Sequence, residues 1–194
     1  MPPRVIAGTA KGRRLKMVPG DKTRPVMDRA KEACFNILGR KVTKAFFLDL
    51  FAGTGSVGIE ALSRGAKQAV FVELDRDAVT IIQENLTITH LEEQAVIRRT
   101  NVLNFLKHSP SQSFDCIYIA PPQYKGLWQE TLELLDKQPT WATPTGIVIV
   151  QIDPTEQQPI SLKHFAPYDE RKYGKTLLWF FKRREIVDDE ESTV

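Results

Sequence analysis

The sequence predicts an α/β fold, with a mostly parallel sheet and helices on both of its faces. From residue 45 onward, short runs rich in Val, Ile and Phe alternate with amphipathic stretches of helical spacing. These runs are nearly continuous, which is typical of parallel strands buried on both faces. The last two runs lie only a few residues apart, and this spacing predicts a hairpin with an antiparallel last strand.

Each element follows from a local pattern. A helix is predicted over 28–38 because Ala30, Ala33, Cys34 and Ile37 recur at helical spacing and Gly39 can end it. The same reasoning predicts helices at 56–63, 77–88, 102–108 and 127–136. Strands are expected at 45–50, 69–73, 95–98, 116–120, 146–152, 165–168 and 176–182.

Length and composition exclude several classes of protein. A chain of 194 residues suits one domain of ordinary size. With 42% hydrophobic and 26% charged residues it can build a core, which excludes a disordered or fibrous protein. We expect no secretory signal and no membrane span, because no long apolar run is present. Cys34 and Cys116 are far apart and the histidines are scattered, so we expect no disulfide scaffold, no metal site and a cytoplasmic location.

The charge is distributed unevenly along the chain. Residues 1–44 hold 12 basic and 3 acidic residues, a net charge of +9, whereas residues 45–194 have a net charge of −6. A segment this basic is expected to bind phosphates, with nucleic acid as the obvious polyanion, although a merely solubilising face is an equal alternative. Three parts are expected: a basic extension at 1–26, an α/β domain at 27–184, and an acidic, disordered tail at 185–194.

A glycine-rich loop follows the first predicted strand and opens the next helix. Gly53, Gly55 and Gly58 form the pattern G-x-G-x-x-G, and Glu73 stands 20 residues after Gly53, at the end of the second strand. In this context the glycines suit a tight turn around a nucleoside cofactor, and the acid suits its ribose hydroxyls.

Asp49 discriminates between the nucleoside cofactors. A carboxylate just before this turn would repel the pyrophosphate of NAD, whereas it would attract the sulfonium and ammonium groups of S-adenosylmethionine. The alternative is that Asp49 caps the helix that follows. Asn101, after the third strand, is equally suited to bind an adenine edge or to act as an ordinary helix N-cap.

The fourth strand ends in a proline-rich loop, Ala120-Pro121-Pro122-Gln123-Tyr124. Ligands of open α/β sheets bind beyond this edge, and prolines there leave rigid carbonyl groups outside the strand ladder. Such a carbonyl can accept a hydrogen bond from an exocyclic amine, and an aromatic side chain can stack on the base. A simple break between strand and loop is the alternative.

Several of these motifs together resemble the RsmD family of guanine-N2 methyltransferases of 16S ribosomal RNA. The resemblance covers the chain except its acidic tail. It is most specific near the N-terminus, in Arg4-Val-Ile-Ala-Gly8, Lys11-Gly-Arg-Arg-Leu-Lys16, Thr23-Arg-Pro25 and Asp28-Arg-Ala-Lys-Glu-Ala33. Asp49-Leu-Phe-Ala-Gly-Thr-Gly55, Phe71-Val-Glu73 and Lys172-Tyr-Gly174 also look like motifs of this family.

The resemblance implies a Rossmann-like class I methyltransferase fold with seven strands, S-adenosylmethionine as cofactor and the small ribosomal subunit as partner. We expect a monomer. The candidate cofactor-binding residues are Arg24, Asp49, Phe51, Gly53, Gly55, Glu73, Leu74, Asn101 and Val102. The candidate RNA-binding residues are Arg4, Lys11, Arg13, Arg14, Lys16 and Arg29. The candidate catalytic residues are Ala120, Pro121, Pro122 and Tyr124.

One motif departs from the family. Where the family has Asp-Pro-Pro-Tyr, this sequence has Ala120 in place of Asp and Gln123 in place of Tyr, and Tyr124 follows one position later. Losing one aimed acceptor costs about 10²–10³ in rate, so we expect a slowed enzyme in which the Pro121 carbonyl accepts the amine. Two alternatives follow from this departure: a non-catalytic RNA-binding or ribosome-assembly factor, and an amino-methyltransferase with another acceptor.

Overall fold

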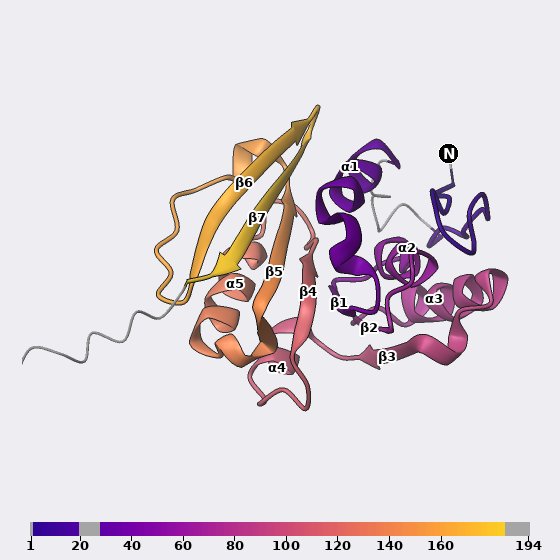
Figure 1. The fold of residues 1–194 in the computed structure, drawn as a ribbon, viewed down its shortest axis with the longest axis horizontal. Coiled ribbons are helices and arrows are strands. Elements are labelled where there is room, and N and C mark those ends of the chain that lie inside the picture. Colours follow the sequence, from indigo (N-terminus) through magenta and orange to yellow (C-terminus); the bar gives the residue numbers. More distant parts are fainter. Residues whose placement is uncertain (1, 20–27, 185–194) are drawn as a thin grey trace, which may run out of the picture.

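The computed structural model describes residues 2–19 and 28–184, and its centre is a seven-stranded sheet (Figure 1). The strand order is β3-β2-β1-β4-β5-β7-β6. Strands β1 to β5 are parallel, whereas β7 pairs antiparallel with both β5 and β6. The strands are β1 (Phe46–Leu50), β2 (Gln68–Glu73), β3 (Ala95–Arg99), β4 (Phe114–Ile119), β5 (Ala142–Ile152), β6 (Phe165–Tyr173) and β7 (Thr176–Arg183). The mostly parallel sheet and the antiparallel last strand are confirmed.

Helices cover both faces of this sheet. The helices are α1 (Asp28–Leu38), α2 (Ser56–Ser63), α3 (Arg76–Thr89), α4 (Val102–Leu106) and α5 (Leu127–Lys137). Apolar side chains of α1, α2 and α3 share one hydrophobic cluster with one face of the strands, and those of α4 and α5 share a second cluster with the other face. The result is a three-layer arrangement in which the central strands β1, β2 and β4 are mostly buried, whereas the edge strand β3 is partly exposed.

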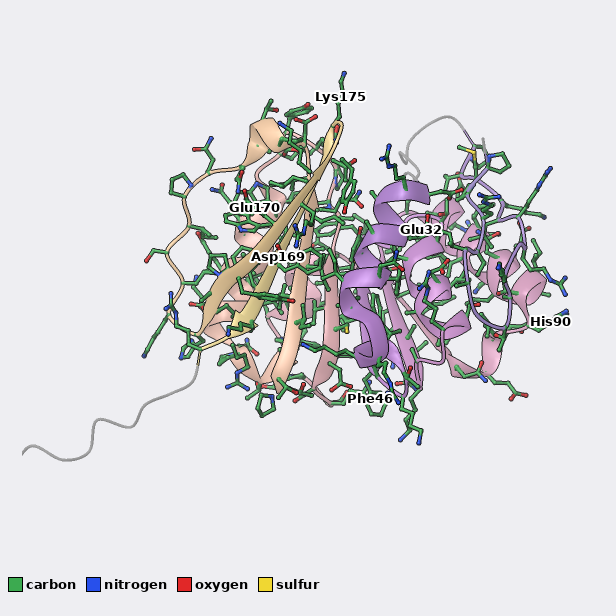
Figure 2. All side chains as sticks on the ribbon, turned by 45° about the horizontal axis from the view of Figure 1, so that its top comes forward. Glu32, Phe46, His90, Asp169, Glu170 and Lys175 are labelled. Carbon is green, nitrogen blue, oxygen red and sulfur yellow. The ribbon has the colours of Figure 1, made fainter. Side chains whose placement is uncertain are left out.

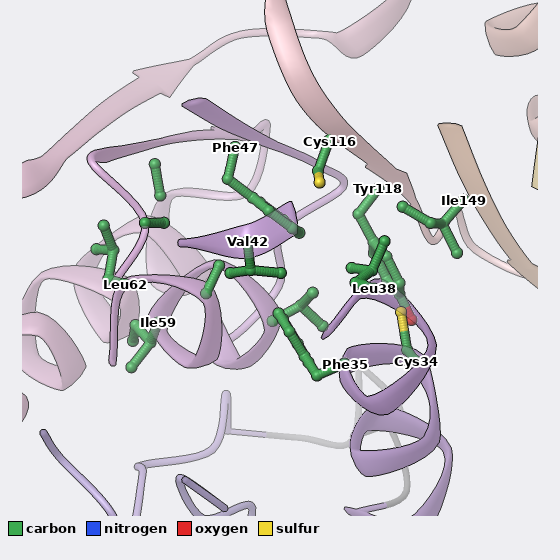
Figure 3. Close-up of a cluster of buried hydrophobic side chains, with 14 of the residues drawn as sticks. Cys34, Phe35, Leu38, Val42, Phe47, Ile59, Leu62, Cys116, Tyr118 and Ile149 are labelled. Atoms are coloured by element: carbon green, nitrogen blue, oxygen red, sulfur yellow. The ribbon is translucent and has the colours of Figure 1, made fainter. Parts of the chain in front are cut away.

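The first hydrophobic cluster contains both cysteines (Figure 3). Phe35 of α1 stacks on Phe47 of β1 with ring centroids 6.1 Å apart, which fixes the helix against the sheet. Cys34 and Cys116 are free and buried, and burial raises the pKa of both thiols, so these side chains act as small apolar residues.

The predicted element boundaries differ from the structure mainly at strands β5 and β6, and β6 runs to Tyr173, five residues beyond its predicted end. Strand β5 differs at its start. It begins at Ala142, four residues earlier than expected, and its register with β4 shifts between Phe114 and Cys116. A Cβ on Gly146 would lie 2.9 Å from the carbonyl oxygen of Phe114, so only glycine fits the close approach at this irregularity. The predicted helix at 102–108 ends earlier, at Leu106.

Candidate active site

The loops that follow β1 and β4 meet where the strand order reverses. β1 and β4 are neighbours with Leu50 paired to Ile119, and the backbone N–H of Ala120 donates to the carbonyl of Leu50 at 3.4 Å. The predicted glycine loop and the predicted Pro-Pro loop therefore leave the sheet side by side. In open α/β sheets this switch point is where ligands bind.

The glycine loop turns sharply between β1 and α2. Gly53 and Gly55 have φ angles of 57° and 75°, in the left-handed region that glycine adopts without strain. Gly58 has a different role, because a Cβ there would lie 2.3 Å from the ring of Phe71 on β2. The first two glycines shape the turn, and the third lets α2 pack closely on the sheet.

Asp49 lies beneath this turn and is only 2% exposed. Its Oδ2 accepts a hydrogen bond from the backbone N–H of Gly58 at 2.9 Å, which is the helix-capping role left open by the sequence. Burial raises the pKa of Asp49 to about 8, with the charge of Glu73 acting in the same direction and the Gly58 N–H opposing it. A buried carboxyl group with a raised pKa is unfavourable for folding and is typical of functional sites. Capping α2 and attracting a cation are compatible roles for this side chain.

Glu73 ties the second strand to the glycine loop. Its Oε2 accepts from the N–H of Gly53 at 2.8 Å, and its Oε1 accepts from the N–H groups of Leu74 and Asp75 at 2.8 and 2.9 Å. The side chain therefore holds two loops together, a role that the sequence did not indicate. Binding of ribose hydroxyls by Glu73 remains a prediction.

The remaining candidate cofactor residues lie at the ends of β1, β2 and β3. Phe51 is half-buried with a positive φ of 61°, and Leu74 is 59% exposed beside Glu73. Asn101 is exposed and caps α4, accepting from the N–H of Asn104 at 3.1 Å, while Val102 behind it is buried. Arg24 lies outside the described residues.

Tyr124 is held in the Pro-Pro loop by contacts from beyond the end of β5. It is 68% exposed and has a φ of 61°, an uncommon conformation for a bulky residue. Its backbone N–H donates to Oε2 of Glu156 at 2.7 Å. Hydrogen bonds from Thr155 and, to a lesser degree, from Tyr124 hold the pKa of Asp153 below its usual value.

Asp153 and Glu156 were missed by the sequence reasoning. They begin and end a capping box around the short 3-10 helix η4 (Pro154–Glu156). An acid followed by Pro and, three residues on, by Glu is a recognisable helix start and could have located this turn. Its contact with Tyr124 spans 32 residues and has no local signal.

The described part of the N-terminal segment, residues 2–19, is packed onto α2 and α3. The N–H groups of Ile6 and Ala7 donate to the carboxylate of Glu60 at 2.8 and 3.0 Å, and the N–H of Lys16 donates to Asn85 at 2.7 Å. A Cβ on Gly8 would lie 1.8 Å from the carbonyl oxygen of Ser63, so the backbones touch there. The segment is thus anchored through its backbone, which leaves its basic side chains outside.

The candidate RNA-binding residues are all exposed. Lys11, Arg13 and Arg14 project from the anchored segment. Arg4 forms an ion pair with Asp28 at 3.3 Å and Lys16 one with Glu84 at 3.1 Å. Arg29 is exposed on the first turn of α1.

A buried ion pair beneath this segment was also missed. Lys31 of α1 is fully buried, donates to the carbonyl of Arg4 at 2.7 Å and lies 3.6 Å from Oε2 of Glu60. Burial lowers the pKa of Lys31, and the charge of Glu60 opposes that shift. Glu60 also accepts from Arg64 at 2.7 Å, so one carboxylate joins α1, α2 and the N-terminal segment. The sequence signal that could have indicated this ion pair is an acidic residue, Glu60, among the apolar residues of α2.

The residues at the glycine loop fit S-adenosylmethionine better than a dinucleotide. The charged side chains that bond this loop are the carboxyl groups of Asp49 and Glu73, which suit hydroxyl and cationic groups and would repel a pyrophosphate. Within residues 2–19 and 28–184 no cluster of His, Cys, Asp and Glu could hold a metal ion, and no described helix is long and apolar enough to cross a membrane.

Comparison with known proteins gives the family. The family described as Conserved hypothetical protein 95 matches residues 3–182. The chain belongs to this family, the RsmD family. Among its RsmD relatives, Ribosomal RNA small subunit methyltransferase D of Haemophilus influenzae is 37% identical over 152 residues, covering 77% of this chain and 78% of that protein. The Escherichia coli protein of the same name is 29% identical over 180 residues, covering 93% and 89%.

Solved structures of the same fold also match the chain. The methyltransferase yhhF of Escherichia coli matches with a TM-score of 0.84 and 30% identity, covering 94% of this chain and 98% of that one. An RNA methyltransferase from Salinibacter ruber, solved with S-adenosyl-L-homocysteine, matches with a TM-score of 0.64 and 15% identity, covering 87% and 100%. The latter likeness concerns the fold. The predicted Rossmann-like class I methyltransferase fold is confirmed.

Proposed function

We propose that this protein transfers a methyl group from S-adenosylmethionine to the exocyclic N2 of a guanine in small-subunit ribosomal RNA. The observation that carries the proposal is the switch point, where a carboxylate-lined glycine loop and the Pro-Pro loop leave the sheet side by side. The naming of the RsmD relatives as ribosomal RNA small subunit methyltransferases supports the reaction class and the RNA.

In this proposal the glycine loop holds the cofactor. When bound, S-adenosylmethionine supplies an electrophilic methyl group. Asp49 attracts its positive charge, Glu73 binds the ribose, and the exposed Leu74 offers an apolar surface to the adenine. Phe51, Asn101 and Val102 line the same edge, and Arg24 is proposed to approach the cofactor from the segment before α1.

The Pro-Pro loop is proposed to hold the guanine. The carbonyl of Pro121 accepts one N–H of the exocyclic amine and so aims its lone pair, while Tyr124 stacks on the base. Ala120 offers no acceptor, so catalysis relies on orientation, with a rate about 10²–10³ below that of a site with an aimed carboxylate. The N-terminal segment 1–26 is proposed to bind the RNA backbone, through contacts that position the RNA without reading its sequence.

Ala120 also supports a second candidate. A family member without the acceptor could retain the fold, the cofactor site and the basic segment and act as an RNA-binding factor in ribosome assembly. A third possibility, closer to the first proposal, is an amino-methyltransferase that methylates another acceptor. For either function we propose a cytoplasmic monomer.

The deciding experiment is transfer of a radiolabelled methyl group to small ribosomal subunits that lack the modification, followed by nucleoside analysis. Label recovered as N2-methylguanosine is expected. Label in another nucleoside would mean that a different base is the methyl acceptor. No label, with intact cofactor binding, would favour the role of ribosome-assembly factor.

The variants Ala120→Asp and Ala120→Asn refine this experiment. Ala120→Asp is expected to raise the rate of methyl transfer by about tenfold or more, because it restores an aimed acceptor. Ala120→Asn, which restores an acceptor without charge, is expected to lie between Ala120→Asp and the wild type. Rates that do not change in either variant would show that the Pro121 carbonyl suffices.

A further inference from the structure

The β6–β7 hairpin brings a charged tip to the same sheet edge as the two loops. Ile152, the last residue of β5, pairs with Leu177, and Leu177 pairs with Lys172 on β6. The hairpin turn at Gly174 and Lys175 therefore lies just past the end of β5, where the parallel strands also end. Figure 2 shows Lys175 pointing away from the body at this tip.

The tip is also close to the loop that is proposed to hold the base. Asp153 directly follows β5, and Lys175 and the side chain of Tyr124 both help lower its pKa, while Glu156 of the same turn accepts from the Tyr124 N–H at 2.7 Å. Tyr173 packs against the same hydrophobic cluster as Ala120. The hairpin is fixed in place, because β7 pairs with β5 along six consecutive residues, from Ile147 to Ile152.

Two lysines at this tip are available for a partner. Arg171 forms an ion pair with Asp169 at 3.3 Å, whereas Lys172 and Lys175 are exposed, and no ion pair of either is found among the described residues. Lysines on an edge strand often protect it against pairing with another chain. That explanation does not cover Lys175, which lies in the turn and outside the strand ladder.

We propose that the tip of the β6–β7 hairpin is a second RNA contact, in which Lys172 and Lys175 bind phosphates on the side of the target nucleotide opposite the N-terminal segment. Figures 1 and 2 show the hairpin on one side of α1 and the N-terminal segment on the other. RNA bound across this edge would meet basic groups on both sides of the switch point, with Arg29 of α1 between them. The inference rests on the proposed function and adds a second anchor to it.

The test compares two double variants of equal charge. Lys172→Ala/Lys175→Ala removes the tip lysines, and Lys163→Ala/Lys182→Ala removes two exposed lysines from the opposite end of the same sheet region. Binding of unmodified small-subunit ribosomal RNA is measured over a salt series. The tip variant is expected to bind about tenfold more weakly at 0.1 M salt and to lower the slope of log K against log salt by about 1.5, because two phosphate contacts are lost. The control variant is expected to change neither quantity.

The outcomes separate the inference from the proposed function. The variant Lys11→Ala/Arg13→Ala/Arg14→Ala/Lys16→Ala serves as the reference for the N-terminal contact, and S-adenosylmethionine binding shows that every variant retains its cofactor site. If this reference weakens RNA binding but the tip variant matches the control, the hairpin contact is wrong and the proposed function stands. Equal losses in the tip and control variants would indicate a general charge effect and also overturn the inference. A wild-type protein that does not bind RNA would overturn both proposals.

Discussion

The loop after β1 and the loop after β4 meet at one sheet edge but are held in different ways. The first is fixed from within the sheet, by the buried Asp49 and by Glu73 of the neighbouring strand. The second carries an exposed Tyr124 in an uncommon backbone conformation and is fixed from the turn after β5, by Glu156. The conformation of the first loop is therefore set by residues of the glycine motif and its neighbouring strand, whereas the conformation of the second loop depends on Glu156, 32 residues further along the chain.

The largest expected effect is on cofactor affinity at the first loop. Asp49→Asn keeps an acceptor for the Gly58 N–H but removes a carboxyl group that ionises above about pH 8, so above that pH we expect S-adenosylmethionine to bind about 100-fold more weakly to the variant. Isothermal titration calorimetry would measure this change. Asp77→Asn, the same substitution at an exposed site in the first turn of α3, is the matched control and should leave the affinity unchanged. Equal affinities for Asp49→Asn and the wild type would leave Asp49 with the capping role alone.

The same substitution should change how stability depends on pH. In the unfolded chain the carboxyl of Asp49 ionises near its usual pKa of 3.8, whereas in the folded protein burial raises the pKa to about 8. The unfolded state therefore binds fewer protons between about pH 4 and pH 8, and the free energy of unfolding falls as the pH rises through this window. Urea unfolding at pH 5, 6.5 and 8 should show that the free energy of unfolding of Asp49→Asn, relative to that of the wild type, rises by a few kcal/mol from pH 5 to pH 8. A constant difference between the two proteins would contradict the raised pKa.

These two predictions concern a region that the sequence described well. The glycine pattern and the acid at the end of β2 have local signals, because a tight turn before a helix requires particular residues at fixed spacing. The strands were predictable for a similar reason, since burial on both faces produces continuous apolar runs. Even here the hydrogen bond from Gly53 to Glu73 joins two strands, and it was found only in the structure.

The second loop and the N-terminal segment were less predictable, because their partners are distant in sequence. Tyr124 is bound by Glu156, and the backbone of residues 6 and 7 is bound by Glu60, more than 50 residues away. The charge of the segment suggested an extension, but its buried Val5 and Leu15 show that the described part is packed into the domain. Composition shows the charge of such a segment, and only packing shows what anchors it.

A substitution at Gly58 would test how closely the first loop depends on packing. Gly58→Ala places a methyl group 2.3 Å from the ring of Phe71, so we expect a loss of about 2 kcal/mol in the free energy of unfolding. Gly126→Ala, at the end of the second loop, meets no atom within 4 Å and should lose about 1 kcal/mol, because of its φ of 66° alone. Thermal and urea unfolding of both variants would measure the difference. A larger loss at Gly126 would reverse the contrast between the loops.

The smallest expected effect concerns the link between Glu156 and Tyr124. Glu156→Ala removes the acceptor for the Tyr124 N–H, and we expect kcat/KM for methyl transfer to fall about fivefold, the loss of one hydrogen bond of about 1 kcal/mol. Glu156→Gln keeps an acceptor oxygen and should restore most of the activity. Tyr124→Ala sets the upper limit, with a loss of about 10–100-fold if the ring stacks on the base. In a double-mutant cycle Glu156→Ala should add nothing to Tyr124→Ala, because the carboxylate acts on the reaction through that residue. Additive losses would mean that Glu156 influences the site by another route, and the second loop would then be as self-contained as the first.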